Sequence, residues 1–470
     1  MRRLAICLLL ALPALPAAAG AATLRTVDIP SNVVDESTAN FNAGGALKAN
    51  VLLPDGYDRR KTYPLLVLLH GAGDTYQSWA APGKGDIRAT AAGLKAIVVM
   101  PDGATGFYAS WFNGGQRGNP EWERYVLEEV LSYARSHYRI RPQRRFHAIA
   151  GLSMGGLGAT FLGGRLPGYF GTVASFSGFV DHQRAEVSAG GLQAVAGVSY
   201  ERIFGPVTGF YATGHNPTRI PGNLARSRLF VGVGDGTVDP VLGTGSPSAA
   251  VAGGAVEVEI RTQVEAFVAA ARKAGVPVTY EPHAGVHDWP YWRKDLRAAI
   301  GHDLFAPVAE RPRAWTNTTV AAAGELFGFR YAFSEPPRGL VRIERSGTDL
   351  RVSGPRVGVT LTTPGGCELQ GTLPLSVTIT RARCRRLRVS VAPRRVRVGR
   401  RVTLRVRAGR PGAVVSAAGR TATADDGGLA LITVRYRRPG LRRVRARSPD
   451  RLPGHARLTI VSRPRPASAD

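Results

Sequence analysis

A serine between glycines is the first place in this chain where residue types and spacing could do chemistry. The segment Gly-Leu-Ser-Met-Gly at residues 151–155 follows an apolar run at 146–150 and precedes a small-residue stretch at 156–162. A strand, a tight turn and a helix in this order form a nucleophile elbow, in which the serine hydroxyl projects above a sheet. Because 57 glycines make chance matches common, it is this setting that makes Ser153 the predicted nucleophile.

An acid should follow the serine along the chain and hold the catalytic base in place. Asp235 comes just after the apolar run at 229–233, where a strand is expected to end. We therefore predict Asp235 as the acid. Asp239 lies close by and stays open as the alternative, and an aspartate after a strand can also simply form a turn.

A histidine should complete the set as the general base. His287 lies in the segment Pro-His-Ala-Gly-Val-His-Asp-Trp at 282–289, near the C-terminal edge of the same region. We predict that His287 takes the proton of Ser153 and returns it to the leaving group. His283 and His302 are the competing histidines.

Backbone N–H groups are expected to bind the oxyanion that forms during acyl transfer. One donor should be Met154, directly after the serine, and the other should come from an earlier strand–loop junction. The segment His-Gly-Ala-Gly at 70–73 occupies such a junction, and Ala72 is the predicted second donor. The aromatic residues in expected loops at strand ends, which could line an acyl or aryl pocket or serve ordinary packing, are Trp79, Trp111 and Trp289.

The elements around these residues alternate between apolar runs and amphipathic stretches over residues 23–305. Short apolar runs are typical of strands buried on both faces of a parallel sheet, and alternation with helices predicts an α/β fold. Helical spacing of apolar residues predicts helices at 121–137 and 257–274. The predicted strands lie at 63–69, 96–100, 146–150 and 229–233.

The N-terminus is typical of a secretory signal. Residues 1–22 combine an arginine pair, a short apolar run and small residues suited to cleavage, so a secreted or cell-surface protein is expected. Cleavage would leave Cys367 and Cys384, which we predict to form a disulfide. Two cysteines fall short of a four-ligand metal site, and neither a metal nor a cofactor is expected. No internal apolar run reaches the length of a membrane span.

The pattern changes after about residue 307, and 470 residues are too many for one ordinary domain. Short alternating runs separated by Gly, Pro and Asp-Gly predict small all-β units. We expect a linker at 306–315, a β-sandwich-like unit at 316–388, an arginine-rich Ig-like unit at 389–463 and a tail at 464–470.

Positive charge is concentrated at the C-terminal end. The net charge is +28, and residues 381–470 hold 25 arginines, no lysine and 4 acidic residues. Such a segment predicts attachment to an anionic cell envelope or polysaccharide, although a general preference for Arg over Lys in this chain would give the same composition. Nucleic acid is not an expected partner, because no recognition motif is present.

With these motifs in place, residues 25–305 resemble the secreted esterase family of the α/β-hydrolases. This family includes feruloyl and acetylxylan esterases, S-formylglutathione hydrolases, enterochelin esterase-like enzymes and mycolyltransferases. The stretches that carry the resemblance are residues 51–57, 63–71, 122–129, 151–156 and 287–292. The resemblance implies the same roles for Ser153, Asp235 and His287. Mycolyltransferases usually place a glutamate as the acid, so an aspartate here is more similar to the hydrolases.

The sequence therefore predicts a secreted serine carboxylic-ester hydrolase that works through an acyl-enzyme. One alternative is a cell-envelope acyltransferase with the same three residues, which would pass the acyl group to a hydroxyl instead of water. The other is a surface-binding protein whose hydrolase domain is catalytically inactive, because fold alone does not establish activity.

Overall fold

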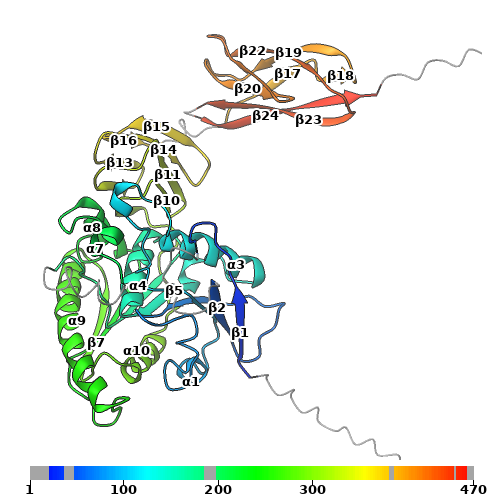
Figure 1. Ribbon diagram of the computed structural model, residues 1–470. Helices are drawn as coiled ribbons and strands as arrows, with labels where there is room; N and C mark the ends of the chain where they lie inside the picture. Colours follow the sequence, from blue (N-terminus) through cyan, green and yellow to red (C-terminus); the bar gives the residue numbers. More distant parts are fainter. Residues whose placement is uncertain (1–20, 36–46, 185–196, 380–385, 449–450, 463–470) are drawn as a thin grey trace, which may run out of the picture.

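The computed structural model describes residues 21–35, 47–184, 197–379, 386–448 and 451–462 (Figure 1). Residues 1–20 of the predicted signal, the predicted tail at 464–470 and Cys384 lie outside these ranges. Signal cleavage and the disulfide between Cys367 and Cys384 therefore stay predictions. Within the described ranges, no helix has the length and apolar character needed to cross a bilayer.

An eight-stranded sheet forms the centre of the first unit, in the order β1-β2-β4-β3-β5-β6-β7-β8. The pairs β1–β2 and β2–β4 are antiparallel and the remaining pairs are parallel. This sheet confirms the predicted α/β-hydrolase class. Its strands are β1 Thr23–Asp28, β2 Lys48–Leu53, β3 Leu65–Leu69, β4 Ile97–Pro101, β5 His147–Leu152, β6 Thr172–Phe176, β7 Arg228–Gly234 and β8 Val278–His283.

Helices cover both faces of this sheet, which explains why the strands from β3 to β7 are buried almost throughout. In β3, Leu65 and Val67 belong to one hydrophobic core, whereas Leu66 and Leu68 belong to the other. The first core contains residues of α2, η2, α3, α4, α7, α8 and α9, and the second contains residues of α1 and α10. The helices are α1 Ile87–Thr90, η1 Asn113–Gly115, α2 Trp122–Arg124, η2 Tyr125–Val130, α3 Leu131–His137, η3 Arg144–Phe146, α4 Met154–Arg165, α7 Tyr200–Phe204, α8 Phe210–His215, η4 Pro221–Leu224, α9 Pro247–Lys273 and α10 Trp289–Gly301.

Two predicted helices differ from the structure in their extent. The helix expected at 121–137 is interrupted by the π-helical η2 between α2 and α3. The helix expected at 257–274 is part of α9, which begins at Pro247. Small residues at 249–255 hide this start in the sequence, because alanines and glycines show little apolar periodicity.

All-β sheets follow the hydrolase unit, as predicted. The first C-terminal β unit has two four-stranded sheets, β10-β11-β14-β15 and β16-β13-β12-β9. The second has a three-stranded sheet, β17-β19-β22, and a five-stranded sheet, β18-β24-β23-β20-β21. The strands are β9 Ala314–Thr319, β10 Ala323–Leu326, β11 Phe329–Phe333, β12 Val341–Ser346, β13 Asp349–Ser353, β14 Gly358–Thr362, β15 Glu368–Thr372, β16 Leu375–Thr378, β17 Ser390–Ala392, β18 Arg395–Arg397, β19 Arg401–Arg407, β20 Val414–Ala417, β21 Arg420–Thr423, β22 Leu429–Arg435, β23 Gly440–Ser448 and β24 Arg451–Val461.

The boundaries of these units depart slightly from the expected ones. Strand β9 begins at Ala314, inside the stretch expected to be a linker. Glu310, from the same stretch, accepts a hydrogen bond of 2.8 Å from the backbone of Arg144. Leu387, placed by prediction in the first β unit, belongs to the hydrophobic core of the second.

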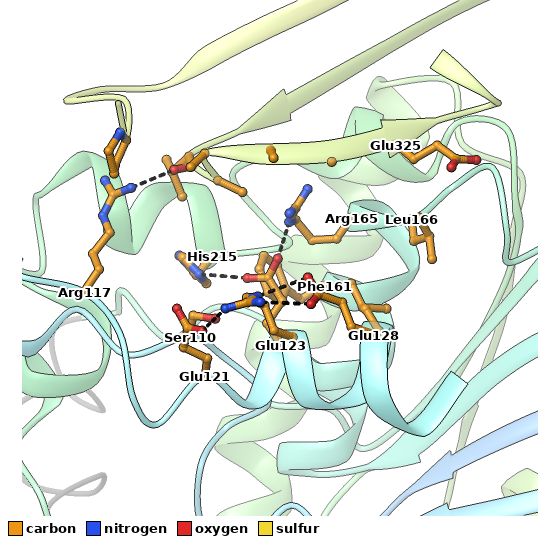
Figure 2. Close-up of a pocket in the computed structure, with 18 of the residues that line it drawn as sticks. Ser110, Arg117, Glu121, Glu123, Glu128, Phe161, Arg165, Leu166, His215 and Glu325 are labelled. Carbon is orange, nitrogen blue, oxygen red and sulfur yellow. Dashed lines mark hydrogen bonds and ion pairs between the residues drawn. The ribbon is translucent and has the colours of Figure 1, made fainter. Parts of the chain in front are cut away.

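Charged side chains tie the hydrolase to the first β unit. Arg165, at the end of α4, donates to Glu123 over 2.6 Å and to the hydroxyl of Tyr331 in β11 over 3.0 Å. His215 Nε2 lies 3.8 Å from Glu123, and Arg117 donates to backbone carbonyls across the same junction. Figure 2 shows Arg117, Glu123, Arg165 and His215 around a cavity of about 630 Å³. The helix α4, which follows Ser153, is therefore anchored to the β unit at its C-terminal end.

Candidate active site

Ser153 lies in the turn between β5 and α4, as an elbow requires. Its φ is 50° and its ψ is −117°, a conformation that a non-glycine residue adopts only under constraint. A Cβ atom on Gly155 would lie 2.6 Å from the carbonyl oxygens of Leu69 and His70. Only glycine allows α4 to approach β3 so closely, which explains this residue of the motif.

His287 lies on the loop between β8 and α10. Its Nδ1 atom is 2.6 Å from Glu257 Oε2, and its ring meets Trp292 edge-on with centroids 5.0 Å apart. The side chain is 13% exposed, whereas that of Glu257 is 1% exposed. The imidazole is thus held from behind by a buried carboxylate while part of it faces outward.

Glu257 projects from α9 and is held by two further donors. Its Oε1 atom accepts from Ser177 Oγ and from the Gly234 backbone N–H, both over 2.6 Å. Burial alone would raise the pKa of Glu257, but the hydrogen bonds from His287, Ser177 and Gly234 outweigh it and lower the pKa. The carboxylate is therefore ionised at neutral pH.

The structure pairs His287 with Glu257, whereas Asp235, the predicted acid, has other partners. Asp235 Oδ1 instead accepts from Thr237, over 2.9 Å at the backbone and 2.5 Å at the hydroxyl, and from Gly285 N–H over 3.3 Å. Asp235 thereby closes the turn after β7 and supports the loop that carries His287. The alternative, Asp239, accepts from the backbone N–H groups of Val241 and Leu242.

Glu257 was not among the acids predicted from the sequence, because it was assigned only as the first residue of the helix expected at 257–274. The structure places Glu257 inside α9, in the same row as Ile260, Val264, Phe267 and Ala271. A carboxylate on the apolar face of a helix is rarely buried unless it is paired. A glutamate in this row of apolar residues was therefore the available sequence signal for a buried, paired carboxylate.

The competing histidines have other partners. His283 Nε2 is 2.9 Å from Asp295 Oδ1, and its Nδ1 is 2.9 Å from the carbonyl of Ala284. His302 bonds Glu281, in the second half of β8. This histidine follows the end of α10, and neither contact involves the Glu257 carboxylate.

The predicted oxyanion donors come from the start of α4 and from the loop after β3. Met154 is the first residue of α4, so its N–H has no acceptor within the helix. A Cβ on Gly71 would lie 3.5 Å from Ser153 Cβ, so the loop with Ala72 passes close to the serine. His70 fixes this loop: Nδ1 is 2.8 Å from the Gly71 carbonyl, and Nε2 accepts from Gly103 N–H over 2.9 Å.

The three tryptophans are buried and make internal contacts. Trp79 donates its indole N–H to Leu69 over 2.9 Å and meets Trp289 edge-on at 5.2 Å. Trp111 donates to Gly106 over 3.2 Å. These contacts agree with the packing role that the sequence left open, and a pocket-lining role stays a prediction.

The family model described as "Putative esterase" matches residues 42–302, which is more than half of the chain. The chain belongs to this esterase family. The match contains the predicted nucleophile, the histidine and Glu257, so the family region and the site coincide.

Several esterase relatives match parts of the chain. Esterase MT1326 of Mycobacterium tuberculosis is 36% identical over 146 residues, which are 30% of this chain and 30% of that protein. The acetyl esterase of Caldicellulosiruptor saccharolyticus is 24% identical over 50% of this chain and 81% of its own. Diacylglycerol acyltransferase/mycolyltransferase Ag85B of Mycolicibacterium smegmatis is 25% identical over 43% of this chain and 65% of its own.

Proposed function

We propose that the protein is a secreted serine esterase that hydrolyses carboxylic esters through Ser153, His287 and Glu257. The hydrogen bond of 2.6 Å between His287 Nδ1 and Glu257 carries this proposal. Because Nδ1 keeps its proton toward Glu257, the lone pair of Nε2 is left to accept the proton of Ser153. Secretion rests on the signal-like composition of residues 1–22.

The proposed reaction has two acyl-transfer steps. Ser153 Oγ attacks the ester carbonyl while its proton passes to His287, and the alcohol leaves with that proton. Water then attacks the acyl-enzyme with His287 again as the base, which releases the acid and restores Ser153. The N–H groups of Met154 and Ala72 would stabilise the oxyanion in both steps, and losing one such donor costs roughly 10²–10³-fold in rate.

A cell-envelope acyltransferase is the second candidate, and Glu257 is the observation that favours it. A glutamate is the acid that the resemblance to mycolyltransferases implies. Both reactions share the acyl-enzyme and differ in the acceptor, which would be a sugar or glycerol hydroxyl instead of water.

Hydrolysis of p-nitrophenyl esters from acetate to octanoate tests the proposal, with wild type and Ser153→Ala compared. We expect activity in the wild type and its loss in the variant at unchanged circular dichroism. Glycerol and a sugar added to the assay identify a transferase, because new ester would then form in place of free acid. A folded wild type without either product would favour the inactive-scaffold alternative, and activity in Ser153→Ala would exclude Ser153 as the nucleophile.

We also propose that the arginine-rich second β unit holds the enzyme on an anionic surface. In the pairing of β23 with β24, Arg443 lies directly opposite Arg457, and both are exposed. Like charges facing each other across strands are destabilising. An anionic partner would relieve this repulsion, which supports a binding role for this surface.

A further inference from the structure

A cleft of about 860 Å³ lies between the hydrolase and the first β unit. One wall is the segment around η4, and the other is the sheet face formed by β9, β12 and β13. Asn223 joins the two walls, because its Nδ2 donates to Thr318 O over 2.9 Å and its Oδ1 accepts from Thr318 N over 2.7 Å. The cleft is therefore part of the interface, and its size is that of a small-ligand site.

Positive charge exceeds negative charge in this cleft. Its lining includes two acidic residues, Glu344 and Asp349. It also includes five arginines, which leave an excess of three positive charges (five minus two); these are Arg219, Arg226, Arg342, Arg345 and Arg351. Among the described residues, Glu344 pairs with Arg342 over 2.8 Å, and no ion pair joins a carboxylate to Arg219, Arg226 or Arg351.

Arg345 lies apart from the other arginines of the lining. It is directly opposite Trp315 in the pairing of β12 with β9, so both side chains lie on the sheet face that carries the hydrophobic core of the first β unit. Arg345 donates there to the carbonyl of Gly347 over 3.1 Å and lies 4.8 Å from the ring centroid of Phe329. The other four arginines are exposed and, with the two acidic residues, leave two excess positive charges facing the cleft (four minus two). A ligand with several acceptor oxygens would bind such a lining.

From this lining we infer that the cleft binds an acidic oligosaccharide, with its carboxylates on the free arginines and its hydroxyls on the polar residues between them. Arg219 and Arg226 flank η4, whereas Arg351 lies on the opposite wall. This spread fits single charges spaced along a chain better than one compact multivalent anion. Thr316 and Ser346 lie among the arginines and supply hydroxyl partners. The guanidinium fork matches a carboxylate with two parallel hydrogen bonds.

The cleft is separate from the proposed ester site. Arg226 precedes the first residue of β7, and Glu257 contacts the last, Gly234. Seven residues of extended strand span about 20 Å. The cleft would thus bind a part of the substrate polymer that is distant from the reacting ester. It could equally bind an acidic chain that is not the substrate.

Arginine modification by phenylglyoxal, mapped by mass spectrometry on the full chain, tests this inference. We expect a short oligogalacturonate to slow modification of Arg226 and Arg351 roughly tenfold, while the exposed Arg59 and Arg338 react at unchanged rates. Because each arginine is read separately, binding of the same probe to the second β unit does not obscure the result. No protection in the cleft, or equal protection at Arg59 and Arg338, would overturn the proposal.

Further probes and matched variants sharpen the test. A neutral oligosaccharide of equal length should give no protection, and tripolyphosphate should protect less than oligogalacturonate. Stronger protection by tripolyphosphate would contradict the acidic-sugar assignment. The variant Arg226→Gln/Arg351→Gln should lose protection at Arg219, whereas Arg59→Gln/Arg338→Gln removes the same charge and should keep it. Both variants should hydrolyse p-nitrophenyl esters at the same rate. The outcome of the binding test therefore does not depend on whether the proposed esterase function is correct.

Discussion

The Glu257 carboxylate is fully buried, yet three hydrogen bonds keep it ionised beside His287. Burying a charge is costly unless it is paired and hydrogen-bonded. A buried carboxylate held on this imidazole therefore supports the proposed role of Glu257, which is to stabilise a positively charged His287. Asp235 has the expected position in the sequence, but its Oδ1 atom accepts hydrogen bonds from Thr237 and Gly285.

Replacing each carboxylate by its amide separates these two roles. Glu257→Gln should lower kcat by roughly 10³–10⁴-fold, because the amide disfavours the tautomer and no longer stabilises the imidazolium. Asp235→Asn, the matched control, should stay within a few-fold of wild type. The measurement is kcat on p-nitrophenyl butyrate at unchanged thermal stability. A larger loss in Asp235→Asn than in Glu257→Gln would reverse the assignment.

Ser177 is a positioning residue for Glu257. It is fully buried, and its φ of 45° is unusual for a serine. Ser177→Ala should lower kcat about tenfold with little change in KM, because Glu257 loses a charge-assisted hydrogen bond. Ser175→Ala, two residues earlier in β6 and without this contact, should leave kcat unchanged. A shift in KM alone would show that Ser177 acts on substrate binding instead.

At the scale of elements, local signals in the sequence predicted the turn that holds Ser153, but they did not predict the carboxylate that bonds His287. The elbow is specified by adjacent residues, so Ser153 and Met154 could be placed from sequence. The acid depends on how α9 packs on β7, and this packing brings residue 257 beside residue 287. Asp235 followed the expected strand end, but side-chain direction after β7 is set by the turn to Thr237. Tertiary packing decides between the two carboxylates, and the sequence signal for Glu257 is its place on the apolar face of α9.

The ion pairs of Glu123 at the C-terminal end of α4 should make the free energy of unfolding depend on pH. Burial would raise the pKa of Glu123, but Arg165 and His215 lower it from 4.5 to about 2. A lowered folded-state pKa stabilises the fold above pH 4.5, and this contribution is lost as pH falls from 4.5 to about 2. It is on the order of 3 kcal/mol.

Urea unfolding between pH 2 and pH 5 measures this contribution. Wild type should lose unfolding free energy across this range more steeply than Glu123→Gln, which has no carboxylate to titrate. Glu325→Gln, at an exposed position of the same junction, should keep the wild-type slope. Equal slopes in wild type and Glu123→Gln would contradict the lowered pKa.

At the scale of the whole molecule, the two β units differ in their relation to the hydrolase. The first shares hydrogen bonds with it through Tyr331, Asn317 and Thr318. The second has a hydrophobic core of its own, drawn from residues 387–460, and lies apart from the hydrolase in Figure 1. The first β unit is thus packed against the hydrolase, whereas the second β unit is an attached module.

Retention on an anionic matrix should depend on that second module. Arg443→Gln/Arg445→Gln/Arg457→Gln should elute at clearly lower salt than wild type, because exposed charges act over about 8 Å at physiological ionic strength. Arg59→Gln/Arg88→Gln/Arg338→Gln removes the same charge elsewhere and should shift elution little. Equal shifts in the two variants would indicate that net charge alone determines retention.

The central claim, that Ser153 is activated by His287 and Glu257, is tested most directly by labelling with a serine-directed phosphonate. The modified peptide should contain Ser153, and labelling should be strongly slowed in Glu257→Gln but not in Asp235→Asn. An adduct on another serine, or labelling of Glu257→Gln at the wild-type rate, would contradict the assignment.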